Sequence, residues 1–296
     1  FPSLESGIAH FDGPGGTQTP REVGEAVAAT LTGPLSNRGT VVLSERNAET
    51  AIAGFRSAMA DFLGVPAGGV VFGRSATQIT YDISRALAKT WGPGDEVVVS
   101  RLDHDCNVRP WVQAAEARGA TLRWLDFDPE TAEIEPSSIE MAIGPRTRLV
   151  AVTGASNMLG TKPPVRAIAD RAHAAGALVY VDGVHYAAHA LVDVAALGAD
   201  LFVCSAYKFL GPHCGILGAD PALLETIRPD KLAPSTDQVP ERFELGTLPY
   251  ELLAGVTAAV DFLASIGDGA TRRERLVSAH RVLHERAHAL FTRLWD

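Results

Sequence analysis

The chain has 296 residues, of which 46% are hydrophobic, so it can bury a sizeable core in one large domain or two unequal ones. Its 26 basic and 35 acidic residues give a formal charge of −9, which disfavours nucleic acid as a partner and favours small-molecule ligands. No stretch approaches the roughly twenty consecutive apolar residues of a membrane span, and three cysteines are too few for a disulfide framework. We therefore expect a globular cytoplasmic protein with no membrane association.

Short apolar runs rich in β-branched residues alternate with helical patterns along the chain. In order, we expect strands over 70–72, 96–100, 121–126, 147–153, 177–182 and 200–205. The first four of these precede expected helices over 77–91, 108–118, 136–143 and 165–175, the fifth precedes a short segment at 185, and the sixth leads into a loop. Repeated strand and helix units predict an α/β fold with a mostly parallel sheet flanked by helices on both faces.

The last part of the chain is predicted to be helical with one interruption. Residues 248–266 have a helical pattern, the glycines of 267–269 break it, and residues 270–295 have a long, charged amphipathic pattern. We therefore expect a large domain over residues 1–266 and the start of a small C-terminal domain over 267–296. Because the chain begins at Phe1 and ends directly after a helical pattern, we expect the small domain to be truncated in this sequence.

Polar side chains directly follow most of the expected strands. They are Ser75 to Thr77, His104, Asn157, Asp182 and Lys208. In parallel sheets ligands bind beyond the carboxyl ends of the strands, so we expect these groups to converge at one edge.

Lys208 and Asp182 together suggest pyridoxal phosphate chemistry. This cofactor needs an amine that holds its aldehyde as an imine, and a carboxylate that keeps its ring nitrogen protonated so that the ring accepts electrons. Lys208 is flanked by apolar residues, a setting in which desolvation lowers the pKa of an amine and makes it nucleophilic. Taken alone, Lys208 could be a solvated surface residue and Asp182 a turn cap, so the prediction depends on finding both together.

A phosphate group needs amide hydrogens and hydroxyls, which the turn before the expected helix 77–91 supplies. The Ala76 amide and the Thr77 hydroxyl are the candidates, at the positive end of the helix. Ser205, three residues before Lys208, could add a further hydroxyl. The alternative is that Ser75 or Thr77 is an ordinary helix cap.

Three further polar residues are candidates for contacts with the cofactor. His104 could lie flat on the ring and exchange protons. His185 could form a hydrogen bond with the phenolic oxygen of the cofactor, and Asn157 could contact that oxygen or a substrate carboxylate. A lone histidine more often has a structural role, and His185 could equally be a capping residue.

These residues give the chain a resemblance to the class V aminotransferase-like family of pyridoxal phosphate enzymes, specifically to its cysteine desulfurase and selenocysteine lyase branch. The likeness covers nearly the whole sequence. Its blocks are 11–17, 37–39, 74–77, 103–104 with Asn107, 157–160, 182–185, 205–211 and 243–247. The resemblance implies the type I fold of pyridoxal phosphate-dependent transferases.

The resemblance also implies roles for individual residues. Lys208 would form the internal aldimine, Asp182 would pair with the ring nitrogen, and His104 would stack on the ring. Thr77 and Ser205 would hold the phosphate. In the implied homodimer, Thr247 would reach the phosphate of the neighbouring subunit's cofactor.

The expected reaction begins at the Cα atom of an amino acid, through an external aldimine and a quinonoid. Cysteine desulfurase-like cleavage of a C–S bond is the expected outcome, with a sulfur acceptor protein as a partner. The family's sulfur-accepting cysteine and carboxylate-binding arginine belong to a C-terminal portion that this sequence lacks. Cys106 is close to His104 in sequence, but we expect a structural thiol there rather than a nucleophile.

Two positions depart from the family pattern. His185 stands where well-known desulfurases have glutamine, and Tyr207 stands where they have a histidine before the lysine. Both residues keep the ability to form hydrogen bonds, so we retain both as cofactor-binding candidates.

Other functions stay open on the sequence. An aminotransferase or epimerase would use the same early steps, and a non-catalytic binding protein could have the same fold. A metal-dependent hydrolase is the alternative from another class, because His185 and His189 have i,i+4 spacing and Asp182 could supply an oxygen ligand. This segment lacks the glutamate of the metalloprotease motif, and we expect no metal.

Overall fold

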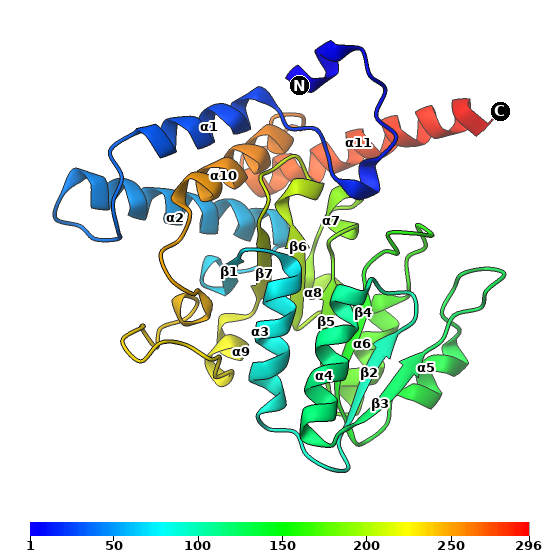
Figure 1. The fold of residues 1–296 in the computed structure, drawn as a ribbon. Helices are drawn as coiled ribbons and strands as arrows, with labels where there is room; N and C mark the ends of the chain where they lie inside the picture. Colours follow the sequence, from blue (N-terminus) through cyan, green and yellow to red (C-terminus); the bar gives the residue numbers. More distant parts are fainter. Residues whose placement is uncertain (296) are drawn as a thin grey trace.

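The protein is built around one seven-stranded sheet (Figure 1). The structure, a computed structural model, describes residues 1–295; Asp296, the end of the expected second domain, lies outside this range. The strands are β1 (Val70–Gly73), β2 (Glu96–Ser100), β3 (Thr121–Leu125), β4 (Thr147–Thr153), β5 (Leu178–Asp182), β6 (Leu201–Ser205) and β7 (Gly215–Ala219), in the order β1-β7-β6-β5-β4-β2-β3. Every strand expected from the sequence is present, with ends that agree to within about one residue.

The sheet is mostly parallel, as predicted. The pairs β2–β3, β2–β4, β4–β5 and β5–β6 are parallel, whereas β7 is antiparallel to both of its neighbours, β1 and β6. The sequence analysis missed β7, in which only Ile216 is β-branched. The link from β6 to β7 is too short for the crossover that a parallel pair needs. Because β7 reverses direction relative to both neighbours, β1 runs the same way as β6 and ends at the same edge.

Helices flank the sheet on both faces (Figure 1). The longer ones are α1 (Arg21–Thr32), α2 (Leu43–Leu63), α3 (Ala76–Ala88), α4 (Arg109–Arg118), α6 (Val165–Ala174), α10 (Tyr250–Ala264) and α11 (Arg272–Trp295). The shorter ones are α5 (Pro136–Ala142), α7 (Tyr186–His189), α8 (Val194–Leu197) and α9 (Pro221–Thr226).

Alternate residues of each central strand pack into opposite layers of the core. In β2, Val97 and Val99 pack in the layer that contains residues of α3 and α4, whereas Val98 packs in the layer that contains residues of α2, α6 and α10. All three valines are fully buried. Each such side chain contributes about 1.5–3 kcal/mol through removal from water. Burial of both sheet faces explains the continuous apolar runs in the sequence.

Helices from the two ends of the chain pack together beside the sheet (Figure 1). Arg272 joins α11 to α2 and α10, through Nη1 to Asp61 at 2.9 Å and Nε to Asp261 at 2.8 Å. Leu276 and Ala279 are buried in the first half of α11, and most of the second half is exposed. The division into domains at residue 266 stays a prediction. Within residues 1–295, no helix is both long and apolar enough to cross a membrane.

Candidate active site

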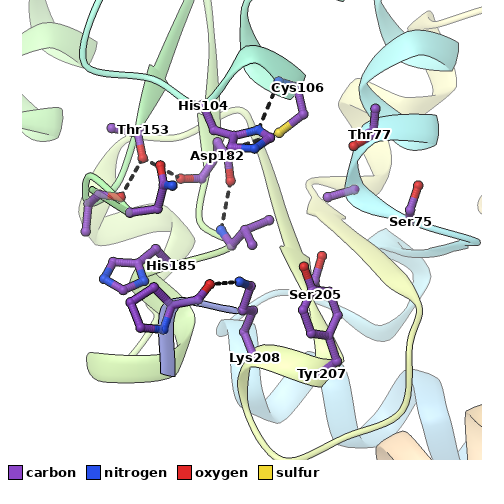
Figure 2. Close-up of a pocket in the computed structure, with 15 residues that line it drawn as sticks. Ser75, Thr77, His104, Cys106, Thr153, Asp182, His185, Ser205, Tyr207 and Lys208 are labelled. Atoms are coloured by element: carbon purple, nitrogen blue, oxygen red, sulfur yellow. Dashed lines mark hydrogen bonds between the residues drawn. The ribbon is translucent and has the colours of Figure 1, made fainter. Parts of the chain in front are cut away.

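A cavity of about 190 Å³ opens at the edge of the sheet where the parallel strands end (Figure 2). Its lining comes from the segments that follow β1, β2, β4, β5 and β6, together with the N-terminal loop. The lining residues are Pro14, Ser75, Ala76, Thr77, His104, Cys106, Thr153, Ala155, Asn157, Asp182, Val184, His185, Ser205, Tyr207 and Lys208. The expected convergence of polar groups at one edge is therefore observed.

Lys208 enters the cavity from η5 (Ala206–Lys208), the single 3-10 turn that follows β6. The residue is only 8% exposed, and its Nζ atom donates a hydrogen bond to the carbonyl oxygen of Pro14. The ammonium also lies 5.0 Å from the centre of the Tyr207 ring. Burial lowers the pKa of Lys208, and the nearby charge of Asp182 opposes this effect. A larger fraction of this amine is therefore neutral at a given pH than in an exposed lysine.

Asp182 is the last residue of β5, the strand next to β6, and it is only 4% exposed. Its Oδ1 atom accepts a hydrogen bond from the Val184 N–H at 2.8 Å, and its Oδ2 atom accepts one from the Cys106 thiol at 3.4 Å. Burial raises the pKa of this carboxyl, whereas the two hydrogen bonds and the charges of His104 and Lys208 lower it. Asp182 and Lys208 thus present a buried acid and a buried amine to one cavity (Figure 2).

The N-terminus of α3 forms another wall of the cavity. Ser75 is the N-cap, and its side-chain oxygen accepts a hydrogen bond from the Gln78 N–H at 3.1 Å. Of the two residues that the sequence offered as helix caps, Ser75 is therefore the cap. Thr77 lies in the first helical turn and lines the cavity. Gly215 lets β7 approach this turn closely, because a Cβ atom at Gly215 would lie 2.6 Å from the Ala76 nitrogen. The helix terminus directs its amide groups and partial positive charge toward the cavity.

His104 begins the turn after β2. Its Nδ1 atom accepts a hydrogen bond from the Cys106 N–H at 3.1 Å, so the neutral ring carries its proton on Nε2. This arrangement fixes the imidazole at the cavity wall opposite Lys208 (Figure 2). An exposed Nε2–H beside the cavity can donate or transfer a proton.

The remaining candidates lie around the same cavity. Ser205 ends β6, and the Tyr207 ring stacks on His213 with centroids 4.8 Å apart. Asn157 and His185 also line the cavity. The His185 ring lies 4.6 Å from that of His189, but residues 1–295 contain no group of three or more His, Cys, Asp or Glu side chains suited to a metal ion.

Thr247 is the one cofactor-binding candidate that lies outside the cavity lining. Its Oγ1 atom donates a hydrogen bond to Asn37 Oδ1 at 3.3 Å, and both side chains are exposed. Each of these two residues belongs to a block on which the family resemblance depends, and the fold brings the two blocks together.

The sequence analysis assigned no role to Pro14 or Thr153, which both line the cavity. Pro14 lies in a turn with no strand before it, so the rule of strand ends could not identify it. Thr153 ends β4 and could have been found by that rule; its hydroxyl donates to the Ala155 carbonyl at 2.8 Å.

The donor set of the cavity fits pyridoxal phosphate. A buried amine, a buried carboxylate, a helix N-terminus with hydroxyls, and a histidine on the wall are the four kinds of group that its aldehyde, ring nitrogen, phosphate and ring face require. All four line one cavity in this protein.

Known proteins resemble the chain over most of its length. At 34% identity it matches an uncharacterised protein of Mycobacterium tuberculosis over 100% of this chain and 74% of that protein. It is 35% identical to a cysteine desulfurase of Dickeya dadantii, over 78% of this chain and 59% of the relative, so the match spans about three fifths of that enzyme. The solved cysteine desulfurase of Thermococcus onnurineus has a TM-score of 0.84 at 26% identity, over 89% of this chain and 69% of that one.

The fold of these relatives confirms the predicted α/β transferase fold with a mostly parallel sheet. The sequence model of the family described as Aminotransferase class-V matches residues 9–290. The chain therefore belongs to the class V aminotransferase family, whose members are pyridoxal phosphate enzymes.

Proposed function

We propose that this protein is a pyridoxal phosphate enzyme that cleaves the C–S bond of an amino acid in the manner of a cysteine desulfurase. The observation that carries the proposal is the buried pair of Asp182, at the end of β5, and Lys208, in the turn after the adjacent strand β6, which line one cavity. One relative described as a cysteine desulfurase and two described as probable cysteine desulfurases, at 33–37% identity, support the reaction class. When bound, the cofactor withdraws electrons from the α-carbon of the attached amino acid.

The roles proposed for the chain's own residues follow from their places in the cavity. Lys208 supplies the amine that attaches the cofactor, and its lowered pKa favours the neutral, nucleophilic form. Asp182 holds a proton on the ring nitrogen by its opposite charge. His104 would lie against the ring face, with its Nε2–H available to hold or move a proton.

Cofactor-anchoring roles are proposed for the remaining lining residues. The Ala76 amide, Thr77 and Ser205 hold the phosphate at the start of α3. Tyr207, Asn157 and His185 supply further hydrogen-bonding groups to the cofactor or the substrate.

The lysine assignment has a direct test. Addition of pyridoxal phosphate to the purified protein should produce a visible absorption band, and Lys208→Ala should lose it. Borohydride reduction followed by peptide mass spectrometry should place the cofactor on Lys208. Lys162→Ala is the matched control, because Lys162 is an exposed lysine near the site, beside Tyr186. An unchanged band in Lys208→Ala would refute the assignment.

The reaction is tested by its products. Full-length protein is mixed separately with cysteine, selenocysteine and a cysteine conjugate, and alanine, sulfide and pyruvate are measured with a thiol present as sulfur acceptor. Alanine without pyruvate supports desulfuration, since β-elimination yields pyruvate instead. Keto-acid-dependent amino transfer or racemisation without C–S cleavage would favour the aminotransferase or the epimerase alternative.

We also propose a homodimer in which Thr247 completes the neighbouring subunit's site. Thr247 is exposed and outside its own cavity. Two apolar side chains near cavity residues in the sequence are strongly exposed: Phe11, three residues before Pro14, is 85% exposed, and Met158, next to Asn157, is 86% exposed. A second subunit packed over the cavity would remove these apolar groups from water.

A mixture of two impaired variants tests the shared site. If Thr247 acts across the interface, a mixed dimer of Lys208→Ala and Thr247→Val has one site with both native residues. Mixing after subunit exchange should therefore restore cofactor binding and turnover in part of the sites. If Thr247 acts within its own subunit, no complete site forms and mixing restores nothing. A cytoplasmic location and a sulfur acceptor protein remain part of this proposal.

A further inference from the structure

Cys106 occupies the cavity wall beside Asp182 (Figure 2). It lies in η4 (Asp105–Asn107), the 3-10 turn after β2, and its thiol donates a hydrogen bond to Asp182 Oδ2 at 3.4 Å. The other two cysteines, Cys204 and Cys214, are buried in the core away from the cavity lining. A thiol is therefore the side-chain donor to the carboxylate that faces the cofactor's ring nitrogen in the proposed function.

The surroundings of Cys106 keep its thiol protonated. Burial is the main cause that raises the pKa of Cys106 well above its ordinary value, and the charge of Asp182 and the hydrogen bond to it act in the same direction. Asp103 adds to the rise, and the Thr77 hydroxyl opposes it. A protonated thiol is a poor nucleophile but a competent hydrogen-bond donor.

Asp182 has one protein donor at each of its two oxygens. The Val184 N–H occupies Oδ1 and the Cys106 thiol occupies Oδ2. Two donors on different oxygens fix the plane of a carboxylate and favour its ionised form. Each oxygen keeps a second lone pair for a further donor.

We propose that Cys106 is a positioning residue that orients Asp182 and keeps it ionised toward the cofactor's ring nitrogen, and that it is not a sulfur-accepting nucleophile. The inference rests on the proposed function and deepens it. The charged or titratable groups around Asp182 are His104 and Lys208, which favour its ionised form, and Asp103, which opposes it, with Tyr180, Tyr207 and Cys204 as neutral neighbours.

The contact is tested first in the cofactor-free protein. The rate of thiol alkylation is measured at one mildly alkaline pH, with Cys106→Ala as the blank for the two core thiols. Asp182→Asn removes the negative charge beside the thiol, so the rate should rise about tenfold or more, as for a thiol pKa lower by about one unit. Asp105→Asn is the control, because Asp105 is adjacent in sequence but exposed, and it should leave the rate unchanged. An unchanged rate in Asp182→Asn overturns the inference.

The role is tested next in the loaded protein, by the dissociation constant of pyridoxal phosphate and the pH dependence of its visible band. Cys106→Ala should weaken cofactor binding about threefold to tenfold, as for the loss of one hydrogen bond, and shift the pH profile of the band. Cys106→Ser keeps a donor and should stay within about twofold of the parent. Cys214→Ala is the control, because it removes an equal thiol from the core. Within residues 1–295 the Cys214 thiol has no side-chain hydrogen bond, so this substitution should leave both the dissociation constant and the pH profile unchanged.

The outcomes separate the possible roles. The inference fails if Cys106→Ser weakens cofactor binding as much as Cys106→Ala does. It also fails if Cys106→Ala binds the cofactor as tightly as the parent protein and has the same pH profile. If both variants lose desulfuration while binding and spectrum stay as in the parent, Cys106 is a nucleophile and the inference also fails. A parent protein that binds no pyridoxal phosphate refutes the proposed function instead, and the alkylation experiment still reports on the contact between Cys106 and Asp182.

Discussion

The Thr153 backbone N–H donates a hydrogen bond to Asp103 Oδ2 at 2.9 Å. Asn107 Nδ2 donates to Oδ1 of the same carboxyl at 2.6 Å. Thr153 ends β4 and Asp103 directly precedes His104, so this carboxyl joins two of the segments that line the cavity. His104 and Cys106 therefore depend for their position on a partly buried acid.

The pH dependence of stability tests the state of Asp103. Burial, with a contribution from the charge of Asp182, raises the pKa of Asp103 from 3.8 to about 8. The folded protein therefore binds this proton up to a higher pH than the unfolded chain does, so the free energy of unfolding should fall as pH rises from about 4 to about 8.

Asp103→Asn cannot lose a proton, and its free energy of unfolding should fall less over this interval, by on the order of 1–2 kcal/mol. Urea denaturation at several pH values measures the difference. The exposed Asp105→Asn should retain the slope of the parent. Equal slopes in the parent and Asp103→Asn would contradict the prediction.

Two residues at the start of α3 are expected to have different roles: Ser75 stabilises the helix, and Thr77 binds the phosphate. Ser75→Ala removes the N-cap hydrogen bond to Gln78 and should lower the free energy of unfolding by about 1 kcal/mol. Thr77→Val keeps the shape of the side chain but removes its hydroxyl, so it should weaken phosphate binding with a smaller effect on stability. Denaturation and titration with pyridoxal phosphate measure the two effects, and a larger loss of stability in Thr77→Val would reverse the assignment.

Gly215 is required by the close approach of β7 to the turn before α3. Gly215→Ala places a methyl group 2.6 Å from the Ala76 nitrogen, where backbone must move, so it should destabilise the fold by about 1–3 kcal/mol and weaken cofactor binding. In Gly218→Ala the nearest atom is Leu63 Cδ1, at 2.7 Å, and this side-chain end can rotate away. Gly218→Ala, the control, should therefore lower the free energy of unfolding less than Gly215→Ala does, and it should leave the cofactor affinity unchanged. Equal effects of the two substitutions on cofactor affinity would argue against this role of Gly215.

A buried ion pair holds the segment that leads to Thr247. Glu244 accepts hydrogen bonds from Arg56 Nη2 and from the Phe72 N–H, each at 2.9 Å, and its side chain is 4% exposed. Glu244→Ala leaves Arg56 buried without this partner, so we expect a loss of about 3 kcal/mol in the free energy of unfolding. Glu140→Ala breaks the more exposed pair with Arg171 and should cost less than about 1 kcal/mol. Thermal or urea denaturation compares the two, and similar losses would contradict the prediction.

The positions of the parallel strands along the chain, and their ends, could be predicted from the sequence, because β-branched apolar runs and the helices between them are local patterns. The same patterns placed Thr77, His104, Asn157, Asp182 and Lys208 at one edge, since the carboxyl ends of parallel strands meet there. The pair of Lys208 and Asp182 already suggested pyridoxal phosphate, and the family resemblance, which the match over residues 9–290 supports, implies the same cofactor.

Contacts between distant parts of the chain were decided by the tertiary structure. Lys208 and Pro14 are 194 residues apart, and no local pattern links a proline in an N-terminal turn to a lysine after β6. The antiparallel β7 escaped prediction because its sequence has little strand propensity and forms through pairing with β1 and β6. The thiol of Cys106 meets Asp182 only because two loops, 76 residues apart, turn toward each other at the sheet edge. Local sequence thus fixed which chemical groups reach the edge of the sheet, and packing decided which of them touch.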